Sequence, residues 1–188
     1  MKLSVVETAA AILIVICISQ AQSTPTAKSV AKPLLLEKDE GEQRTWRDPP
    51  PGGFTLKVSP QNNGSQHLVF GTEDLLPGDN IPRHKHLAQD EIVFIQAGTV
   101  HVRLGDRERD LHTGGTVFIP ARTWVSFKNN SAEPVSIAFV FSAPGFEKHL
   151  RCVSVPAGEK PTPTKLPEEK QCVHEGQVVY QEEEETKK

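Results

Sequence analysis

The sequence lacks a clear excess of charge of either sign. Twenty-one Lys and Arg residues stand against twenty-four Asp and Glu residues, so the formal net charge is −3. A chain this close to neutral offers neither a basic field for nucleic acid nor a polybasic patch for anionic lipid. We therefore expect a small-molecule ligand or substrate and no nucleic-acid partner.

Long apolar runs are also scarce. One run of about ten residues, from Ala9 to Ile18, is too short to cross a bilayer, which needs about twenty. Lys2 precedes it and Ser19-Gln20-Ala21 follows it, which is typical of a secretory signal peptide. We expect residues 1–21 to be removed, the protein to be secreted or periplasmic, and membrane contact only through this segment. An uncleaved anchor, or a buried strand or helix, is the alternative.

Cysteine is too rare for a disulfide-rich scaffold. Of three cysteines, Cys17 lies in the signal segment, which leaves Cys152 and Cys172. An even count in an exported chain predicts a disulfide, and two unpaired thiols are the alternative. The spacing of the pair fits no common zinc site.

The sequence also has no clean helical periodicity over three turns and no nucleotide-binding or serine-hydrolase motif. Neither G-x-G-x-x-G nor G-x-S-x-G occurs. From about Ser65, short runs rich in Val, Ile, Phe and Thr alternate with Gly, Asp, Asn or Pro at intervals of roughly ten residues. That spacing predicts one all-β domain, an antiparallel barrel or sandwich.

Changes in amino-acid composition divide the chain into four parts. After the signal segment, residues 22–62 predict an extended N-terminal arm in which residues 33–36 could dock as an edge strand. Residues 63–145 form the predicted barrel. Residues 146–188 form a C-terminal extension with a loop closed by the disulfide and a short strand at "GQVVY". A helix could form at "GFEKHLR", outside the core.

The segment "PGDNIPRHKHLAQDEIVFIQAG", residues 77–98, holds the main candidate site. His84 and His86 are two apart and point to one face of an extended chain, and a turn would bring Glu91 toward the same interior. Two imidazoles and one carboxylate suit a divalent transition metal, such as Fe, Mn, Ni or Zn, and leave positions open for substrate. Gly78 and Gly98 would supply turns on either side. A solvent-exposed polar turn is the alternative.

The spacing Gly, five residues, His, one, His, four, Glu, six, Gly resembles the first motif of the cupin superfamily. The resemblance covers about residues 65–145. It implies a cupin-type β-barrel (double-stranded β-helix or jelly roll), a metal bound by His84, His86 and Glu91, and a possible homodimer. It also implies that Glu91 is catalytic, as a ligand that can accept a proton.

The second cupin motif is incomplete. Gly114, Pro120 and Asn129 fall at expected positions, but Arg122 replaces the usual glycine and Val125 replaces the usual histidine. Three interpretations remain: a three-ligand site survives, His101 or His112 replaces the missing ligand, or the barrel binds something other than metal.

Other residues carry weaker predictions. Val100 and Val102 should face the core, which leaves His101 outside. The remaining histidines are expected to be ordinary polar residues; these are His67, His112, His149 and His174. Three aromatic side chains are expected to lie in the core or to line a pocket; these are Phe118, Trp124 and Phe127.

The sequence therefore predicts an exported metal-binding cupin. The segment 143–147, "APGFE", is similar to that of small quercetin-dioxygenase-like cupins and suggests an oxygenase or isomerase acting on a small organic molecule. The alternative is a non-catalytic small-molecule-binding or structural cupin with a vestigial metal site. A third is an interaction module whose arm and tail pack on a second subunit.

Overall fold

A computed structural model describes residues 31–49 and 51–181. The predicted signal peptide lies outside these residues. The described strands and helices, in chain order, are β1 (Glu42–Trp46), β2 (Gly53–Val58), the 3-10 turn η1 (Pro60–Asn62), β3 (Val69–Leu75), β4 (Asn80–His86), β5 (Glu91–Ala97), β6 (Thr99–Leu104), β7 (Arg107–His112), β8 (Thr116–Ile119), β9 (Val125–Lys128), β10 (Val135–Phe141), α1 (Phe146–Cys152), β11 (Ser154–Pro156), α2 (Leu166–Gly176) and β12 (Val178–Tyr180).

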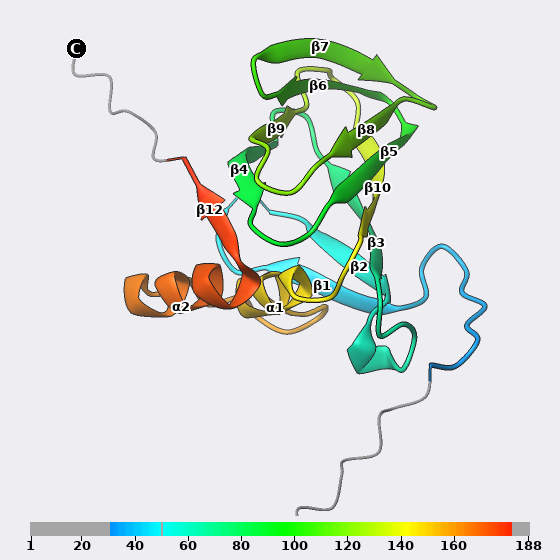
Figure 1. Cartoon of the computed structure of the whole chain (residues 1–188), viewed down its shortest axis with the longest axis vertical. Helices are drawn as coiled ribbons and strands as arrows, with labels where there is room; N and C mark the ends of the chain where they lie inside the picture. The colour runs from blue at the N-terminus through cyan, green and yellow to red at the C-terminus, as the bar shows by residue number, and fades with distance from the viewer. Residues whose placement is uncertain (1–30, 50, 182–188) are drawn as a thin grey trace, which may run out of the picture.

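The strands form two antiparallel sheets that close into a barrel, with both helices at one end (Figure 1). The larger sheet has the order β11-β1-β2-β3-β10-β5-β8, and the smaller has the order β12-β4-β9-β6-β7. The predicted all-β barrel architecture is thereby confirmed. Neither described helix is both long and apolar enough to cross a membrane.

Alternation of apolar and polar residues decides which face of each strand lies inside. On β5, Glu91, Val93 and Ile95 are buried whereas Ile92 and Phe94 are exposed. Strand β10 lies between β3 and β5, and most of its side chains are buried on the inner face. Since successive side chains of a strand point to opposite faces, this pattern fixes which residues can reach the barrel interior.

The expectation of an extended arm over residues 22–62 is wrong for residues 42–58. Residues 42–46 and 53–58 form β1 and β2, which pair as an antiparallel hairpin in the larger sheet. The sequence obscured β1 because its polar residues are engaged in the fold. The Arg44 guanidinium, for example, donates 2.7 Å to Ser154 Oγ and 2.9 Å to the Ser154 carbonyl. Residues 33–36 form no strand, and Leu35 is almost fully exposed.

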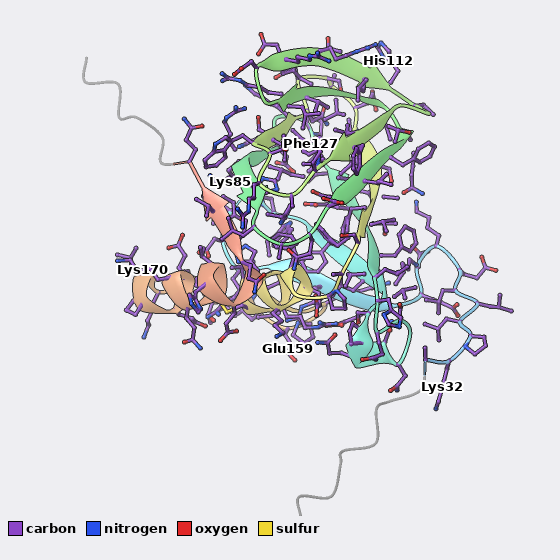
Figure 2. All side chains as sticks on the ribbon, in the orientation of Figure 1. Lys32, Lys85, His112, Phe127, Glu159 and Lys170 are labelled. Atoms are coloured by element: carbon purple, nitrogen blue, oxygen red, sulfur yellow. A yellow bond between two sulfur atoms is a disulfide. The ribbon has the colours of Figure 1, made fainter. Side chains whose placement is uncertain are left out.

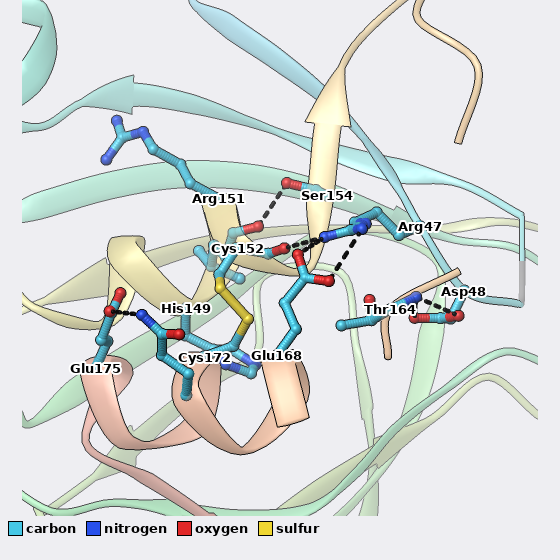
Figure 3. Close-up of a disulfide and its surroundings, with 12 residues drawn as sticks. Arg47, Asp48, His149, Arg151, Cys152, Ser154, Thr164, Glu168, Cys172 and Glu175 are labelled. Carbon is cyan, nitrogen blue, oxygen red and sulfur yellow. Dashed lines mark hydrogen bonds and ion pairs between the residues drawn. A yellow bond between two sulfur atoms is a disulfide. The ribbon is translucent and has the colours of Figure 1, made fainter. Parts of the chain in front are cut away.

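The C-terminal extension differs in two respects from expectation. Helix α1 forms where a helix was predicted, but Phe146 and Leu150 join the barrel core instead of lying outside it. Helix α2 occupies a segment expected to be a loop. The predicted disulfide joins Cys152, at the end of α1, to Cys172 in α2, with a Cα–Cα distance of 5.5 Å (Figure 3).

The disulfide is one of several contacts that hold this extension. The Arg47 guanidinium, from the loop after β1, pairs with Glu168 of α2 and donates to the Cys152 carbonyl (Figure 3). Strand β12 forms in the "GQVVY" segment, where a short strand was predicted; it pairs with β4 and places Tyr180 opposite His84. The extension therefore covers the end of the barrel where the predicted ligands lie.

Candidate metal site

The structure brings His84, His86 and Glu91 together inside the barrel. The two histidines lie on β4 and Glu91 begins β5, and one donor atom from each residue lies within 4.8 Å of the other two. All three side chains are buried. Lys85, between the histidines, points the other way, with its ammonium 4.5 Å from the centre of the Trp124 ring. The strand thus alternates as its sequence predicts.

The turns on either side also form as expected. Gly78 and Gly98 both have φ of +88°, in the region that favours glycine. At Gly98 a Cβ would lie 3.0 Å from the Pro134 carbonyl oxygen and 3.1 Å from the Cα of Val135. A larger residue there would combine backbone strain with a close contact, which explains why a glycine occupies position 98.

The chemistry of the three donors fits a divalent cation. His84 Nδ1 lies 2.8 Å from the Pro82 carbonyl and donates to it, which leaves the lone pair on Nε2 for a metal. Burial, reinforced by the neighbouring His86, lowers the pKa of His84 to about 4, so its imidazole is neutral at pH 7. His86 Nε2 is 3.2 Å from a Glu91 carboxylate oxygen. This cluster of two imidazoles and one carboxylate could hold a metal ion.

The fourth ligand position of the cupin pattern holds an apolar side chain. Val125 is paired with His84 across β4 and β9, and it is fully buried in the core. His101 and His112 do not replace it. Each lies on the side of the β6–β7 hairpin away from the triad, where His101 Nδ1 is 2.8 Å from Asp110 and His112 Nδ1 is 2.9 Å from Thr99 Oγ1. The prediction that Val100 and Val102 face the core is confirmed.

Two aromatic predictions need correction. Phe118 is 56% exposed on β8 and does not line the core, because it takes an outward position in the strand alternation. Trp124 is half-buried and packs on Lys85 outside the barrel. Phe127 is buried in the core, as expected, and lies within the barrel in Figure 2.

A cavity of about 620 Å³ opens from the triad toward the C-terminal extension. His84 and Glu91 line it, and so do Tyr180 of β12 and His149 of α1. His149 was expected to be an ordinary polar residue, but it is buried, and its Nε2 lies 2.8 Å from the Tyr180 hydroxyl. Burial lowers the pKa of His149 to about 4. The cavity therefore has one wall that the cupin motifs do not supply.

Aromatic rings close the triad off from solvent on one side. The His86 ring is 4.3 Å from the Phe146 ring and 5.0 Å from the Phe141 ring, measured between centroids, both in edge-on contact. Phe146 comes from α1, and Phe141 ends β10. These contacts cover one side of the His86 ring, whereas His84 and Glu91 face the cavity.

Glu73 is a cavity residue that sequence reasoning missed. It occupies an inward position on β3, in line with Val69, Gly71 and Leu75, and it lines the cavity. Burial raises the pKa of Glu73 to about 8, although the neighbouring Trp46 side chain favours the charged form. The signal was present in the alternation of "VFGTEDL", where a carboxylate falls on the apolar face.

Comparison with known proteins agrees with this fold. Residues 71–141 match the cupin domain model. Protein SchB of Streptomyces halstedii is 28% identical over 88 residues, which are 47% of this chain and 64% of that protein, so the match spans just under two thirds of the relative.

One solved structure superposes closely enough to show the same fold. A predicted oxalate decarboxylase from Thermotoga maritima superposes with a TM-score of 0.53 at 16% identity, covering 59% of this chain and all of that one. The TT1209 protein of Thermus thermophilus has 30% identity and a TM-score of 0.41, covering 42% of this chain and 75% of that one. With its two antiparallel sheets and a match to the cupin domain over the strands that carry the triad, residues 71–141 of this chain form a cupin domain.

Proposed function

We propose that this protein is a metal-dependent enzyme, an oxygenase or isomerase, that acts on a small organic molecule in the barrel cavity. The observation that carries the proposal is the set of three donor atoms, from His84, His86 and Glu91, within 4.8 Å of one another at the edge of a 620 Å³ cavity. Buried imidazole and carboxylate groups that converge without an Arg or Lys partner are expensive unless they serve a ligand.

The side chains around the cavity would have different roles in the reaction. A divalent ion at the triad would act as a Lewis acid toward a bound oxygen atom of the substrate. Glu91, when it is not engaged as a ligand, would act as the proton acceptor for the substrate, because it is the carboxylate at the triad. The Tyr180 hydroxyl, fixed by His149, faces the cavity as a second polar group that can orient a substrate.

We also propose that the protein is exported, to the periplasm or outside the cell. The signal-peptide pattern of residues 1–21 supports this location. The Cys152–Cys172 bond supports it as well, because structural disulfides persist in oxidising compartments.

Metal content tests the enzymatic proposal. We expect about one divalent ion per chain in the protein purified without added chelator, and less than one tenth of that in the double variant His84→Ala and His86→Ala. The matched control removes two histidines outside the site, His101→Ala and His112→Ala, and should retain the ion. Equal metal in all three proteins would contradict the proposal. A metal-free protein that small molecules still stabilise against heat would favour the non-catalytic alternative, which the apolar Val125 supports.

A further inference from the structure

The inner wall of the cavity is mainly aromatic and aliphatic. The rings of Phe139 and Phe141 are 5.6 Å apart and those of Phe141 and Phe146 are 4.9 Å apart, measured between centroids, and all three residues line the cavity. Ile137 of β10 and Val173 of α2 line it as well. Tilted rings at these distances form a surface on which a flat apolar ring of a ligand can pack edge-on or offset.

The carboxyl groups around this wall already have partners or face solvent. Burial raises the pKa of Glu73 to about 8, so its carboxyl group is neutral at pH 7, and the Trp46 side chain hydrogen-bonds it. Glu91 belongs to the proposed metal site. Of the other four acidic residues in the lining, two accept backbone hydrogen bonds within loops and two are exposed to solvent; these are Asp48 and Asp79, and Asp74 and Glu169.

A charged ligand would therefore gain little in this cavity. None of the Lys and Arg side chains in the described ranges lines it, so an anion would meet no basic partner. A cation would leave water for a wall whose inner carboxyl group, that of Glu73, is neutral and engaged, and a metal at the triad would repel it. Because an unpaired charge is costly to transfer into apolar surroundings, the cavity favours an uncharged molecule.

Hydrogen-bonding groups meet where the C-terminal extension adjoins the triad. The Tyr180 hydroxyl is 2.8 Å from His149 Nε2, and the Tyr180 ring is 5.8 Å from the His84 ring, between centroids. Helix α2 packs directly on His149, because a Cβ at Gly176 would lie 2.3 Å from the His149 Cβ. A tyrosine hydroxyl can both donate and accept, so its contact with His149 leaves it able to bond a ligand oxygen beside the triad.

The volume of the cavity sets the size of the ligand. It is about 620 Å³, within the range of small-molecule sites. An apolar cavity of roughly 150 Å³ is enough to hold benzene, so this one has room for about two or three rings.

We propose that the cavity binds an uncharged, mainly apolar ring molecule with one hydroxyl-bearing end, which bonds Tyr180 beside the triad while the rings pack on Phe139, Phe141 and Phe146. This class of substrate deepens the proposed function and rests on it only for the reaction, because binding itself does not require the metal. A sugar or a small dicarboxylate would leave most of its polar groups without partners against the phenylalanine wall.

Fluorescence titration with naphthalene probes of similar shape tests the ligand class. Neutral 2-naphthol carries a hydroxyl group, and neutral 2-methylnaphthalene lacks it; 2-naphthoate is an anion and 2-naphthylmethylammonium is a cation. We expect the full-length protein at pH 7 to bind 2-naphthol at least about tenfold more tightly than either ion, because the wall does not compensate a charge. It should bind 2-methylnaphthalene about threefold to tenfold more weakly than 2-naphthol, because this probe cannot bond Tyr180.

Two variants test where the probe lies. Tyr180→Phe should bind both neutral probes equally and keep the original affinity for 2-methylnaphthalene, whereas the control Thr99→Val, which removes a hydroxyl bonded to a histidine outside the cavity, should bind like the original protein. Val173→Trp should weaken binding of both neutral probes at least about tenfold, because the indole fills space that the probe needs. The control Val179→Trp adds the same bulk on the opposite face of β12 and should leave binding unchanged.

The proposal fails if either ion binds as tightly as 2-naphthol, if no neutral probe binds, or if Val173→Trp, shown to be folded by circular dichroism, binds 2-naphthol unchanged. A hydroxyl preference that survives in Tyr180→Phe would overturn the placement of the polar end. Metal content measured on the same samples separates this proposal from the enzymatic one. A metal-loaded protein that binds no neutral probe contradicts only the ligand class, and a metal-free protein that binds 2-naphthol as expected contradicts only the enzyme.

Discussion

At the scale of single residues, the cavity combines three predicted metal ligands with Glu73, which was not predicted to lie there. His84, His86 and Glu91 are placed by strand alternation and a short turn, so a local pattern was enough to predict them. Val125 is equally local: it fills the position of a fourth ligand with an apolar side chain. Glu73 lies outside the motif, which begins at Gly78, and only the closed barrel brings it into the cavity.

Restoring the missing histidine should strengthen metal binding. Val125 is buried and paired with His84, so Val125→His would direct a third imidazole into the barrel. We expect the dissociation constant for Zn²⁺, measured by competition with a chelator dye, to fall by at least about tenfold, which corresponds to about 1.4 kcal/mol. The metal-free variant should be less stable, because it buries a polar ring. Unchanged or weaker Zn²⁺ binding in a folded variant would show that position 125 does not face the ion.

The buried carboxyl group of Glu73 predicts an unusual pH dependence of stability. Its pKa is about 8 in the folded protein and near 4.5 when unfolded, so the folded state holds an extra proton between these pH values. The contribution of Glu73 to the free energy of unfolding is therefore fully present below about pH 4.5. It is lost as the pH rises through 8. Glu91, Asp74 and Asp79 add repulsion in the same direction.

Denaturant unfolding of the metal-free protein at pH 5.5 and pH 8.5 checks this prediction. We expect the free energy of unfolding of the original protein to fall by roughly 2 kcal/mol more than that of Glu73→Gln, after allowance for water in the cavity. The control variant Glu159→Gln removes the same charge at an exposed position, and its free energy of unfolding should change with pH as that of the original protein does. Parallel pH profiles for the original protein and Glu73→Gln would mean that Glu73 is solvated and ordinary.

At the scale of elements, the C-terminal extension completes the site. Helix α1 places Phe146 against His86, α2 is tied to α1 by the disulfide, and β12 adds Tyr180 beside His84. None of these elements lies within residues 71–141, which match the cupin domain. The barrel supplies the proposed ligands, and the extension supplies one wall and the closure.

Removing the disulfide should loosen this wall before it affects the barrel. The bond closes a loop with a sequence separation of 20 residues, and in the chain-entropy model that constraint is worth about 3 kcal/mol. We expect Cys152→Ser with Cys172→Ser to lower the midpoint of thermal unfolding by several degrees. Hydrogen exchange should rise in α2 and β12 and stay low in β3, β5 and β10. Uniform exchange across all these elements would contradict a separable extension.

At the scale of the whole molecule, much of the fold followed from the sequence because barrel strands are short, alternating and separated by turn residues. The β5 alternation and the Gly78 and Gly98 turns are examples of such local signals. Strand β1 and helix α2 were missed because distant contacts stabilise them, such as that of Arg44 with Ser154 and the Arg47–Glu168 pair. His149 and Tyr180 could not be placed in the site, because only the packing of α1 on the core and the pairing of β12 with β4 bring them there.

The most direct measurement is an anomalous-diffraction map from crystals of the full-length protein loaded with Mn²⁺. The account predicts one strong peak inside the barrel, about 2.0–2.3 Å from His84 Nε2, His86 Nε2 and a Glu91 carboxylate oxygen. A barrel without such a peak, or a peak bound by other residues while these three side chains remain uncoordinated, would contradict it.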